Sequence, residues 1–436
     1  MNKRKPGLAI MISLLAFSFL QAQEKKPITL TEAIELSVKN SKQLKNSQAK
    51  IEEATAVLRE AVERKLPDAK VSASYLRLNS ANVDLKTKNN NGSGGTTPNI
   101  SQAAYGILNV SLPIYAGGRI RYGIEASKYL AEATKLDAEN DKEEVIQNTV
   151  EAYVNLYKSK QTINLIKENL NQAQHRVTDL TNLEKNGLLP RNDLLKAELQ
   201  QSNVELALLD AENNWQLVNV SMDLLLGLPE KTELIPDSTL ADQAFTVKTL
   251  DEYVQAAYTN RKDLASLGLR KKATETGVKI AKGDYYPSLA LTGGYIAADI
   301  PKFITITNAI DIGAGVSYNL GSLWKTKAKV QEAQARTKQL EISESLLNDN
   351  IRLEVSKAYL NWTSNQKKTE VYAKAVEQAN ENYRITKNKY DNTLATTAEL
   401  IDADIAQLQA RMNLIFVKAD AVVLYNKLLQ TAGSLE

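Results

Sequence analysis

The sequence predicts a mainly α-helical fold with a smaller β part, built from two tandem copies of one structural unit. Three observations support this prediction. The chain repeats its own pattern, it contains two very long stretches without helix breakers, and it contains four short stretches in which apolar and polar residues alternate. We place repeat one at residues 27–228 and repeat two at residues 249–433.

The internal repeat is visible as residues that recur at a fixed spacing. The matching positions are Leu30 and Leu250, Asn40 and Asn260, Pro67 and Pro287, Tyr153 and Tyr359, Leu194 and Leu400, and Gly227 and Gly433. The spacing is 220 residues for the first three pairs and 206 for the others, so the first copy carries a 14-residue insertion. The insertion lies within Asn79–Ser101, which is rich in Asn, Gly, Ser and Thr and includes the polar run Asn89–Gly95. We expect this segment to be an extracellular loop.

Two stretches predict unusually long helices. Arg119–Asn186 contains one glycine and no proline, and Lys325–Asp391 contains neither. At about 1.5 Å per residue each would form a rod about 100 Å long. Apolar residues follow one another at alternating steps of three and four, which is coiled-coil spacing. The stripe in the first copy comprises Ile163, Ile166, Leu170, Ala173, Val177 and Leu180.

The remaining helical segments are about half as long. Leu30–Leu66 and Pro190–Leu226 would match one long helix if they stacked end to end, which predicts an antiparallel pair of rods. The rods reverse at Gly187–Pro190 in the first copy and at Asn392–Ala395 in the second. Leu228–Lys248, with two prolines, is interpreted as a connecting segment.

Four alternating segments predict strands at about 67–78, 104–114, 287–298 and 309–320. Each has the roughly 10-residue length with which a tilted strand crosses a bilayer, and one face of each is apolar. Four strands cannot close a barrel, and open edges in lipid leave backbone groups unpaired. Three copies would supply 12 strands and leave a lumen, which predicts a homotrimer. A small soluble sheet capping a helical bundle would show the same alternation.

Composition argues for export and against catalysis. Residues 1–22 resemble a secretory signal, with Lys3, Arg4 and Lys5 before an apolar run that is too short to span a membrane. Without them the chain carries 51 basic and 51 acidic residues, so nothing favours a nucleic-acid partner. There is no cysteine, and the single histidine, His175, lies among polar residues on a face interpreted as solvated. We expect no enzyme activity, no cofactor and no metal site.

Motifs in order along the chain resemble those of the TolC-like outer-membrane efflux proteins. They are Leu30–Lys45 (LTEAIELSVKNSKQLK), Leu66-Pro67, Tyr286-Pro287, Pro113–Arg119 (PIYAGGR), Asn260–Leu264 (NRKDL), and the two helix reversals. The resemblance implies a homotrimer in the outer membrane, with a 12-stranded barrel continuous with a periplasmic tunnel of antiparallel coiled-coil helices. It implies partnership with a periplasmic adaptor protein, an inner-membrane transporter and outer-membrane lipid, as the exit duct of a tripartite efflux or type I secretion system.

The resemblance also assigns candidate sites. The periplasmic gate would be lined by Glu399 and Asp402, although acidic residues near a helix N-terminus are also common for structural reasons. The junction between barrel and tunnel would comprise Pro113, Gly117, Gly118 and Arg119. The tips that contact the adaptor would comprise Gly187, Leu188, Leu189, Pro190, Arg191, Asp193, Thr393, Leu394 and Ala395. Ala395 replaces an arginine that helps to hold the tip of TolC closed.

A second function class stays open at this point. A secreted or surface-bound coiled-coil scaffold or adhesin without a channel would share the long helices and the signal segment. The sequence specifies neither the exported substrate nor the class of transporter.

Overall fold

The computed structural model describes residues 25–81, 100–242, 245–301 and 303–435. These residues form two compact units. Unit 1 comprises the described residues within 25–48, 137–262 and 347–435, and unit 2 those within 49–136 and 263–346. The expected signal segment and most of the expected extracellular loop lie outside the described residues.

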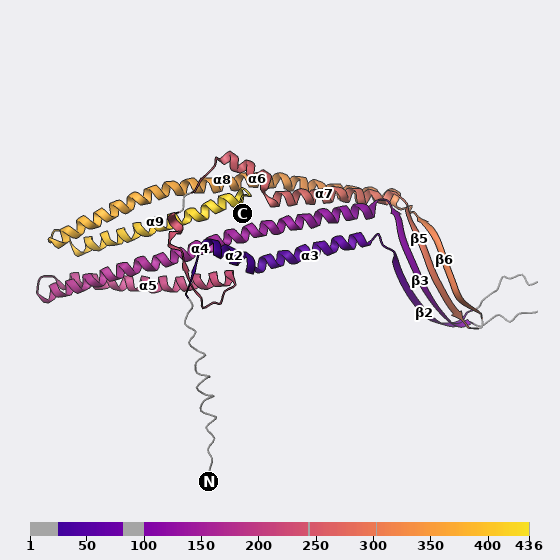
Figure 1. Cartoon of the computed structure of the whole chain (residues 1–436), viewed down its shortest axis with the longest axis horizontal. Helices are drawn as coiled ribbons and strands as arrows, with labels where there is room; N and C mark the ends of the chain where they lie inside the picture. Colours follow the sequence, from indigo (N-terminus) through magenta and orange to yellow (C-terminus); the bar gives the residue numbers. More distant parts are fainter. Residues whose placement is uncertain (1–24, 82–99, 243–244, 302, 436) are drawn as a thin grey trace, which may run out of the picture. The chain divides into compact units, whose positions relative to one another are not determined.

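Unit 1 is built on two antiparallel helix pairs (Figure 1). The 67-residue helix α4 (Arg119–Lys185) pairs with α5 (Arg191–Leu226), and the 70-residue helix α8 (Ser322–Asp391) pairs with α9 (Thr397–Thr431). The expected stripe of α4 is buried or half-buried along its whole length, and Leu194 and Ala197 of α5 are buried with it. The predicted mainly helical, duplicated fold with long antiparallel coiled coils is therefore confirmed.

The shorter helices differ from the prediction in one respect. Instead of one helix over Leu30–Leu66, the chain forms α2 (Leu30–Asn40) and α3 (Lys42–Glu63), and repeat two likewise forms α6 (Leu250–Asn260) and α7 (Lys262–Lys282). Ser41 and Arg261 interrupt the helices, with ψ angles of 122° and 126°. The interruption has a structural reason, because it brings the end of each first helix against the end of a returning helix.

In repeat one, the amide of Asn40 donates a hydrogen bond to the carbonyl of Leu226, with 2.6 Å between the atoms. Gly227, in the left-handed conformation, packs so closely on Asn40 that an added Cβ would lie 2.9 Å from it. Gly433 packs equally closely against Asn260, so the same asparagine–glycine contact occurs in each copy.

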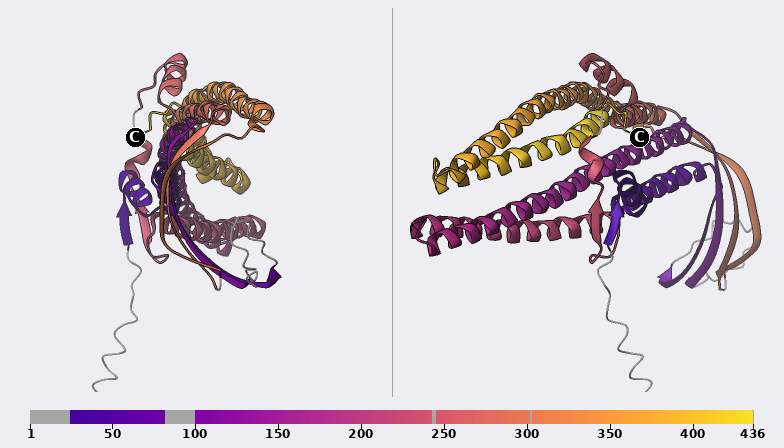
Figure 2. Two further views of the ribbon diagram at one scale, coloured as in Figure 1. Left: turned by 90° about the vertical axis from the view of Figure 1, so that its right-hand side faces the viewer. Right: turned by 60° about the vertical axis from the view of Figure 1, so that its left-hand side comes forward.

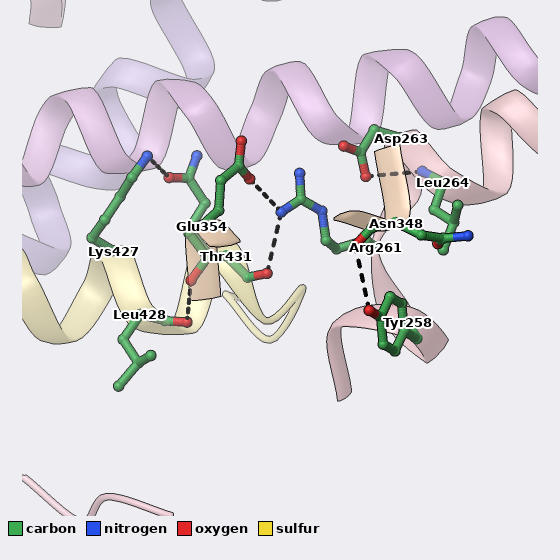
Figure 3. A network of polar contacts seen from close by, with 10 residues as sticks. Tyr258, Arg261, Asp263, Leu264, Asn348, Glu354, Lys427, Leu428 and Thr431 are labelled. Carbon is green, nitrogen blue, oxygen red and sulfur yellow. Dashed lines mark hydrogen bonds and ion pairs between the residues drawn. The ribbon is translucent and has the colours of Figure 1, made fainter. Parts of the chain in front are cut away.

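Repeat two adds an arginine to this contact (Figure 3). The guanidinium of Arg261 donates to the carboxylate of Glu354 at 2.7 Å and to the carbonyl of Thr431 at 3.4 Å. The hydroxyl of Thr431 in turn donates to the carbonyl of Leu428. Arg261 therefore ties the break between α6 and α7 to α8 and to the last turn of α9.

The expected connecting segment Leu228–Lys248 is more than a connection. It contains the strand β4 (Glu233–Pro236) and the short 3₁₀ helix η1 (Ser238–Asp242), and β4 pairs in parallel with β1 (Lys25–Ile28). Tyr153 of α4 is buried beneath this sheet; its hydroxyl donates to the carbonyl of Ile28 and accepts from the amide of Asp237. Burial raises the pKa of Tyr153 to about 12. The segment does connect the two repeats, as expected, but the short strand within it was not predicted, because four residues carry no readable alternation.

Next to this sheet, α5 buries a carboxylate. Asp223 has no exposed surface, and one of its oxygens accepts a hydrogen bond from the amide of Asn219 at 3.1 Å. Burial, and to a smaller extent the charge of Glu230, raises the pKa of Asp223 to about 6. Its pKa in the unfolded chain is near 3.8. The folded chain therefore binds the proton more tightly than the unfolded chain does.

This difference predicts a pH dependence of stability. The contribution of protonated Asp223 is fully present below pH 3.8 and is lost as the pH rises through about 6. We expect Asp223→Asn to raise the free energy of unfolding at pH 7.5 by up to about 3 kcal/mol, and the apparent thermal midpoint with it, and to change both little at pH 4. Circular dichroism of both proteins in the same detergent at the two pH values measures this. An equal gain at both pH values would show that the carboxylate is not the cause.

Unit 2 contains a four-stranded antiparallel sheet in the order β2-β3-β5-β6. The strands are β2 (Asp68–Ala81), β3 (Ile100–Ala116), β5 (Ser288–Ile300) and β6 (Ile304–Ser317). Each overlaps one of the four expected segments. β3 and β6 begin four and five residues before the expected start, and β6 ends three residues before the expected end. Figure 2 shows the strands curving together along their length. The 3₁₀ turn η2 (Gly283–Tyr285) leads into β5.

The register aligns the apolar residues on one face of the sheet. Val71 is paired with Leu108, Leu108 with Tyr295, and Tyr295 with Ile310. The adjacent residues along each strand lie on the other face and are also paired across the sheet: Lys70 with Asn109, Asn109 with Gly294, and Gly294 with Asp311. The apolar face is open in the single chain, because the Ile312 side chain is 90% exposed. Among the described residues, no helix has the length and apolar character needed to cross a membrane.

Candidate functional site

The tip of the first helix pair is shaped by a left-handed glycine. Gly187 has φ 72°, and the amide of Leu188 donates to the carbonyl of Leu183 at 2.9 Å, which ends α4. Leu189 turns inward onto a small cluster of Leu180, Leu194 and Ala197. The side chain of Leu188 is 73% exposed at the apex.

Charged residues flank this tip. Arg191 lies 3.9 Å from Glu184 across the turn, and Asp193 pairs with Lys196 at 3.1 Å. Pro190 occupies the N-cap of α5 and not its first helical residue. The charges at this tip therefore neutralise one another in pairs.

The second tip repeats the first one with a threonine in place of the glycine. Thr393 has φ 62°, a conformation that costs a β-branched residue energy, and the amide of Leu394 donates to the carbonyl of Lys389. Leu394, like Leu188, is fully at the surface, with 75% of its side chain exposed. Ala395 is half-buried where the first tip has Leu189. Both apexes thus present one exposed leucine.

The two predicted gate carboxylates lie one turn apart at the start of α9, and both are exposed. Glu399 forms a capping box: its carboxylate accepts from the amide of Thr396 at 2.7 Å and from its hydroxyl at 3.0 Å. The backbone hydrogen bond from Thr396 is the main reason that the pKa of Glu399 lies below its usual range. Glu399 therefore has a structural role that the sequence shows as Thr396-x-x-Glu399, and it keeps its negative charge in that role.

A buried ion pair near the tips was not predicted. Arg176 of α4 donates to the carboxylate of Asp404 of α9 at 2.9 Å, with only 9% and 6% of the two side chains exposed. The amide of Asn169 donates to the other oxygen of Asp404. This group links the first repeat to the second within unit 1. Arg176 is the neighbour of His175 in the polar stretch interpreted as solvated, yet little of its side chain is exposed; His175 itself is exposed.

Two more ion pairs join α4 to α9. Arg411 of α9 makes two hydrogen bonds of 3.0 Å to Glu168 of α4, and Lys158 of α4 pairs with Asp420 of α9. The three α4–α9 ion pairs bridge helices that belong to different repeats, so they hold the two antiparallel helix pairs together.

The strand-to-helix junction in unit 2 brings the backbone of the two repeats into direct contact. Gly117 and Gly118 have φ angles of 62° and 78°, and a Cβ on Gly117 would lie 2.2 Å from the carbonyl oxygen of Gly283. Arg119 donates to the carbonyl of Ala116 and to the carboxylate of Asp284 at 2.9 Å. Pro113 stands where the pairing of β3 with β5 shifts register.

Asp284 is the polar centre of this junction. Its second oxygen accepts from Lys329 of α8 at 2.7 Å. The hydrogen bond from Lys329 is the main reason that the pKa of Asp284 is lowered; the charge of Arg119 contributes less. The carboxylate therefore stays ionised between two cations.

Comparison with known proteins identifies the class to which this geometry belongs. The family model for outer membrane efflux proteins matches residues 33–228 and 253–434, so the chain belongs to the outer membrane efflux protein family. The outer membrane efflux protein BepC of Brucella suis biovar 1 (strain 1330) is 23% identical over 353 residues, which are 79% of this chain and 72% of BepC.

Solved structures show the same fold. The CusC channel has a TM-score of 0.79 with 17% identity, over 93% of this chain and 92% of CusC. The Campylobacter jejuni outer membrane channel CmeC has a TM-score of 0.78 with 20% identity, over 93% of this chain and 86% of CmeC. The protein is an outer-membrane efflux channel with a periplasmic extension, in a family that works with periplasmic adaptors and inner-membrane transporters. A scaffold or adhesin without a channel is not favoured.

Proposed function

We propose that three copies of this chain close one channel, which forms the exit duct of a tripartite efflux or type I secretion system. The observation that carries this proposal is the sheet of unit 2. Its apolar residues share one exposed face, and its outer strands, β2 and β6, each have one edge without a partner strand among the described residues. Lipid would cover the apolar face, and strands of neighbouring copies would cover the two edges.

Subunit counting by light scattering in detergent tests this proposal. We expect a particle with the protein mass of three chains, which resists dissociation at room temperature. A matched pair of variants locates the contact: Val71→Pro lies on the edge strand β2, and Leu108→Pro lies on the interior strand β3. The first should weaken the trimer and the second should prevent the sheet from forming. A stable monomer in detergent would contradict the proposal.

The helix tips are the proposed contact with the periplasmic adaptor. Leu188 and Leu394 expose apolar side chains at the two apexes, and an adaptor would bury them. The residues around them would determine the shape and charge of the surface that the adaptor contacts. They are Gly187, Leu189, Pro190, Arg191, Asp193, Thr393 and Ala395. The substrate that passes is not specified by these surfaces.

Glu399 and Asp402 are the proposed gate carboxylates. In a trimer they would place six carboxylates around one axis, and such a ring would favour cations in the mouth of the channel. We expect Glu399→Gln with Asp402→Asn to reduce the cation-to-anion permeability ratio severalfold in planar bilayers. The hydrogen bonds of the capping box would weaken, at a cost of about 1 kcal/mol.

The matched control lies at the other tip. Asp193 is already paired with Lys196, so Asp193→Asn should change ion selectivity much less. An unchanged permeability ratio in the gate variant would show that other residues line the mouth.

A further inference from the structure

Unit 2 contains a cavity of about 970 Å³ at the strand-to-helix junction. It lies where α3, β3, the start of α4 and the end of α7 meet. Four cationic residues line it, Lys65, Arg121, Lys279 and Lys282, and no acidic residue does. All four are exposed, and no ion pair to a carboxylate is found for any of them within the described residues. The cavity is therefore strongly positive.

Two carboxylates near the cavity are engaged in ion pairs with other residues. Asp284 is held between Arg119 and Lys329, and Glu60 pairs with Arg64 along α3. Asp68 lies on the polar face of the sheet, where its backbone pairs with that of Ser111, and it does not line the cavity. Nothing in these contacts neutralises the cavity, so an anion from outside the chain is the natural counter-charge.

The other side of the cavity is apolar and aromatic. Leu112 and Tyr115 line it, and the register with Leu291 and Leu289 puts both on the apolar face of the sheet. Ile114 is 59% exposed and Tyr286 56% exposed beside them. The ammonium of Lys279 lies 5.5 Å from the ring centroid of Tyr122. Tyrosines and basic residues at the end of an apolar membrane-facing surface mark the depth of lipid headgroups.

The position in the sheet keeps the cavity accessible in an assembly. β3 and β5 are interior strands, and a neighbouring chain would pair with β2 or β6. If the sheet spans the outer membrane as proposed above, the cavity would face the leaflet on the periplasmic side.

We propose that this cavity binds the phosphate-bearing headgroup of an anionic glycerophospholipid of that leaflet. The phosphate lies among Lys65, Arg121, Lys279 and Lys282, and the acyl chains run along the apolar face that begins at Leu112. A bound lipid would fix the depth of the sheet in the membrane at the point where strands give way to helices.

Native mass spectrometry of the reconstituted full chain tests the proposal. The protein is placed in vesicles of 90% phosphatidylcholine and 10% phosphatidylglycerol, extracted in mild detergent, and its retained lipids are counted. Since each cation near a lipid surface contributes about 1 kcal/mol, we expect the ratio of phosphatidylglycerol to phosphatidylcholine among the retained lipids to be at least about tenfold higher than in the vesicle.

The variant Lys65→Gln, Arg121→Gln, Lys279→Gln, Lys282→Gln should lose this enrichment. The matched control, Lys50→Gln, Arg59→Gln, Lys135→Gln, Lys338→Gln, removes the same charge from exposed positions of unit 2 outside the cavity lining and should keep it. The pair Lys279→Gln with Lys282→Gln, which disturbs the fold less, should reduce the enrichment severalfold.

Three results would overturn the proposal. One is equal enrichment in the cavity variant and the control. Another is displacement of the lipid by 10 mM inorganic phosphate in 150 mM salt, which would assign the cavity to a soluble phosphate anion. The third is retention of phosphatidylcholine and phosphatidylglycerol by the parent protein in the same ratio as in the vesicle.

Discussion

Gly117→Ala should destabilise this channel more than any other single glycine replacement in unit 2. The new Cβ would lie 2.2 Å from the carbonyl oxygen of Gly283, which is a backbone atom. The connection from β3 to α4 would therefore have to move away from the connection between α7 and β5. The φ angle of 62° adds a further penalty for any residue with a Cβ. Together these costs come to about 3–5 kcal/mol.

Replacements of two other glycines separate the cost of the steric clash from the cost of the positive φ angle. Gly187→Ala meets the same left-handed conformation with open space around it, so it should cost only about 1 kcal/mol. Gly123→Ala, inside α4 with nothing within 4 Å, should stabilise the helix by up to about 1 kcal/mol. Apparent thermal midpoints of the three variants, followed by circular dichroism in one detergent, give the order. A Gly117 variant as stable as the Gly187 variant would mean that the junction has room to relax.

The junction illustrates what sequence reasoning could find. Gly117-Gly118-Arg119 between a strand pattern and a helix pattern predicts a special turn, because glycine is the usual choice for positive φ. The partner of that turn could not be predicted. Gly283 and Asp284 come from the other repeat, at the end of α7, and only the register of β3 with β5 brings them to Gly117 and Arg119.

The helix tips likewise combine a residue whose conformation the sequence predicts with one whose conformation it does not. Gly187 signals a helix end from composition alone, whereas Thr393 occupies the equivalent conformation with no local signal. Helix and strand periodicity extends over many residues and is readable in the sequence. The pairing of β1 with β4 and the burial of Arg176 depend on contacts between distant segments, and for these the sequence carries too short a pattern.

Asp404→Ala should have the second large effect. It would leave the guanidinium of Arg176, only 9% exposed, without its carboxylate, and it would remove the acceptor of Asn169. Breaking one side of a buried ion pair typically costs about 3–5 kcal/mol. Because this pair joins α4 to α9, the loss should also loosen the contact between the two repeats near the tips. We expect a lower apparent unfolding midpoint and faster proteolytic cleavage at the tips.

The neighbouring pair supplies the control. Arg411 and Glu168 bridge the same helices, but 36% and 48% of their side chains are exposed, so Glu168→Ala should cost less than about 1 kcal/mol. Replacing both buried partners, Arg176→Leu with Asp404→Leu, should recover most of the stability, since no charge is then left unpaired. If Asp404→Ala and Glu168→Ala shift the midpoint equally, the Arg176–Asp404 pair is open to water in the assembled channel. The link between the repeats would then rest on the apolar contacts of α4 with α9.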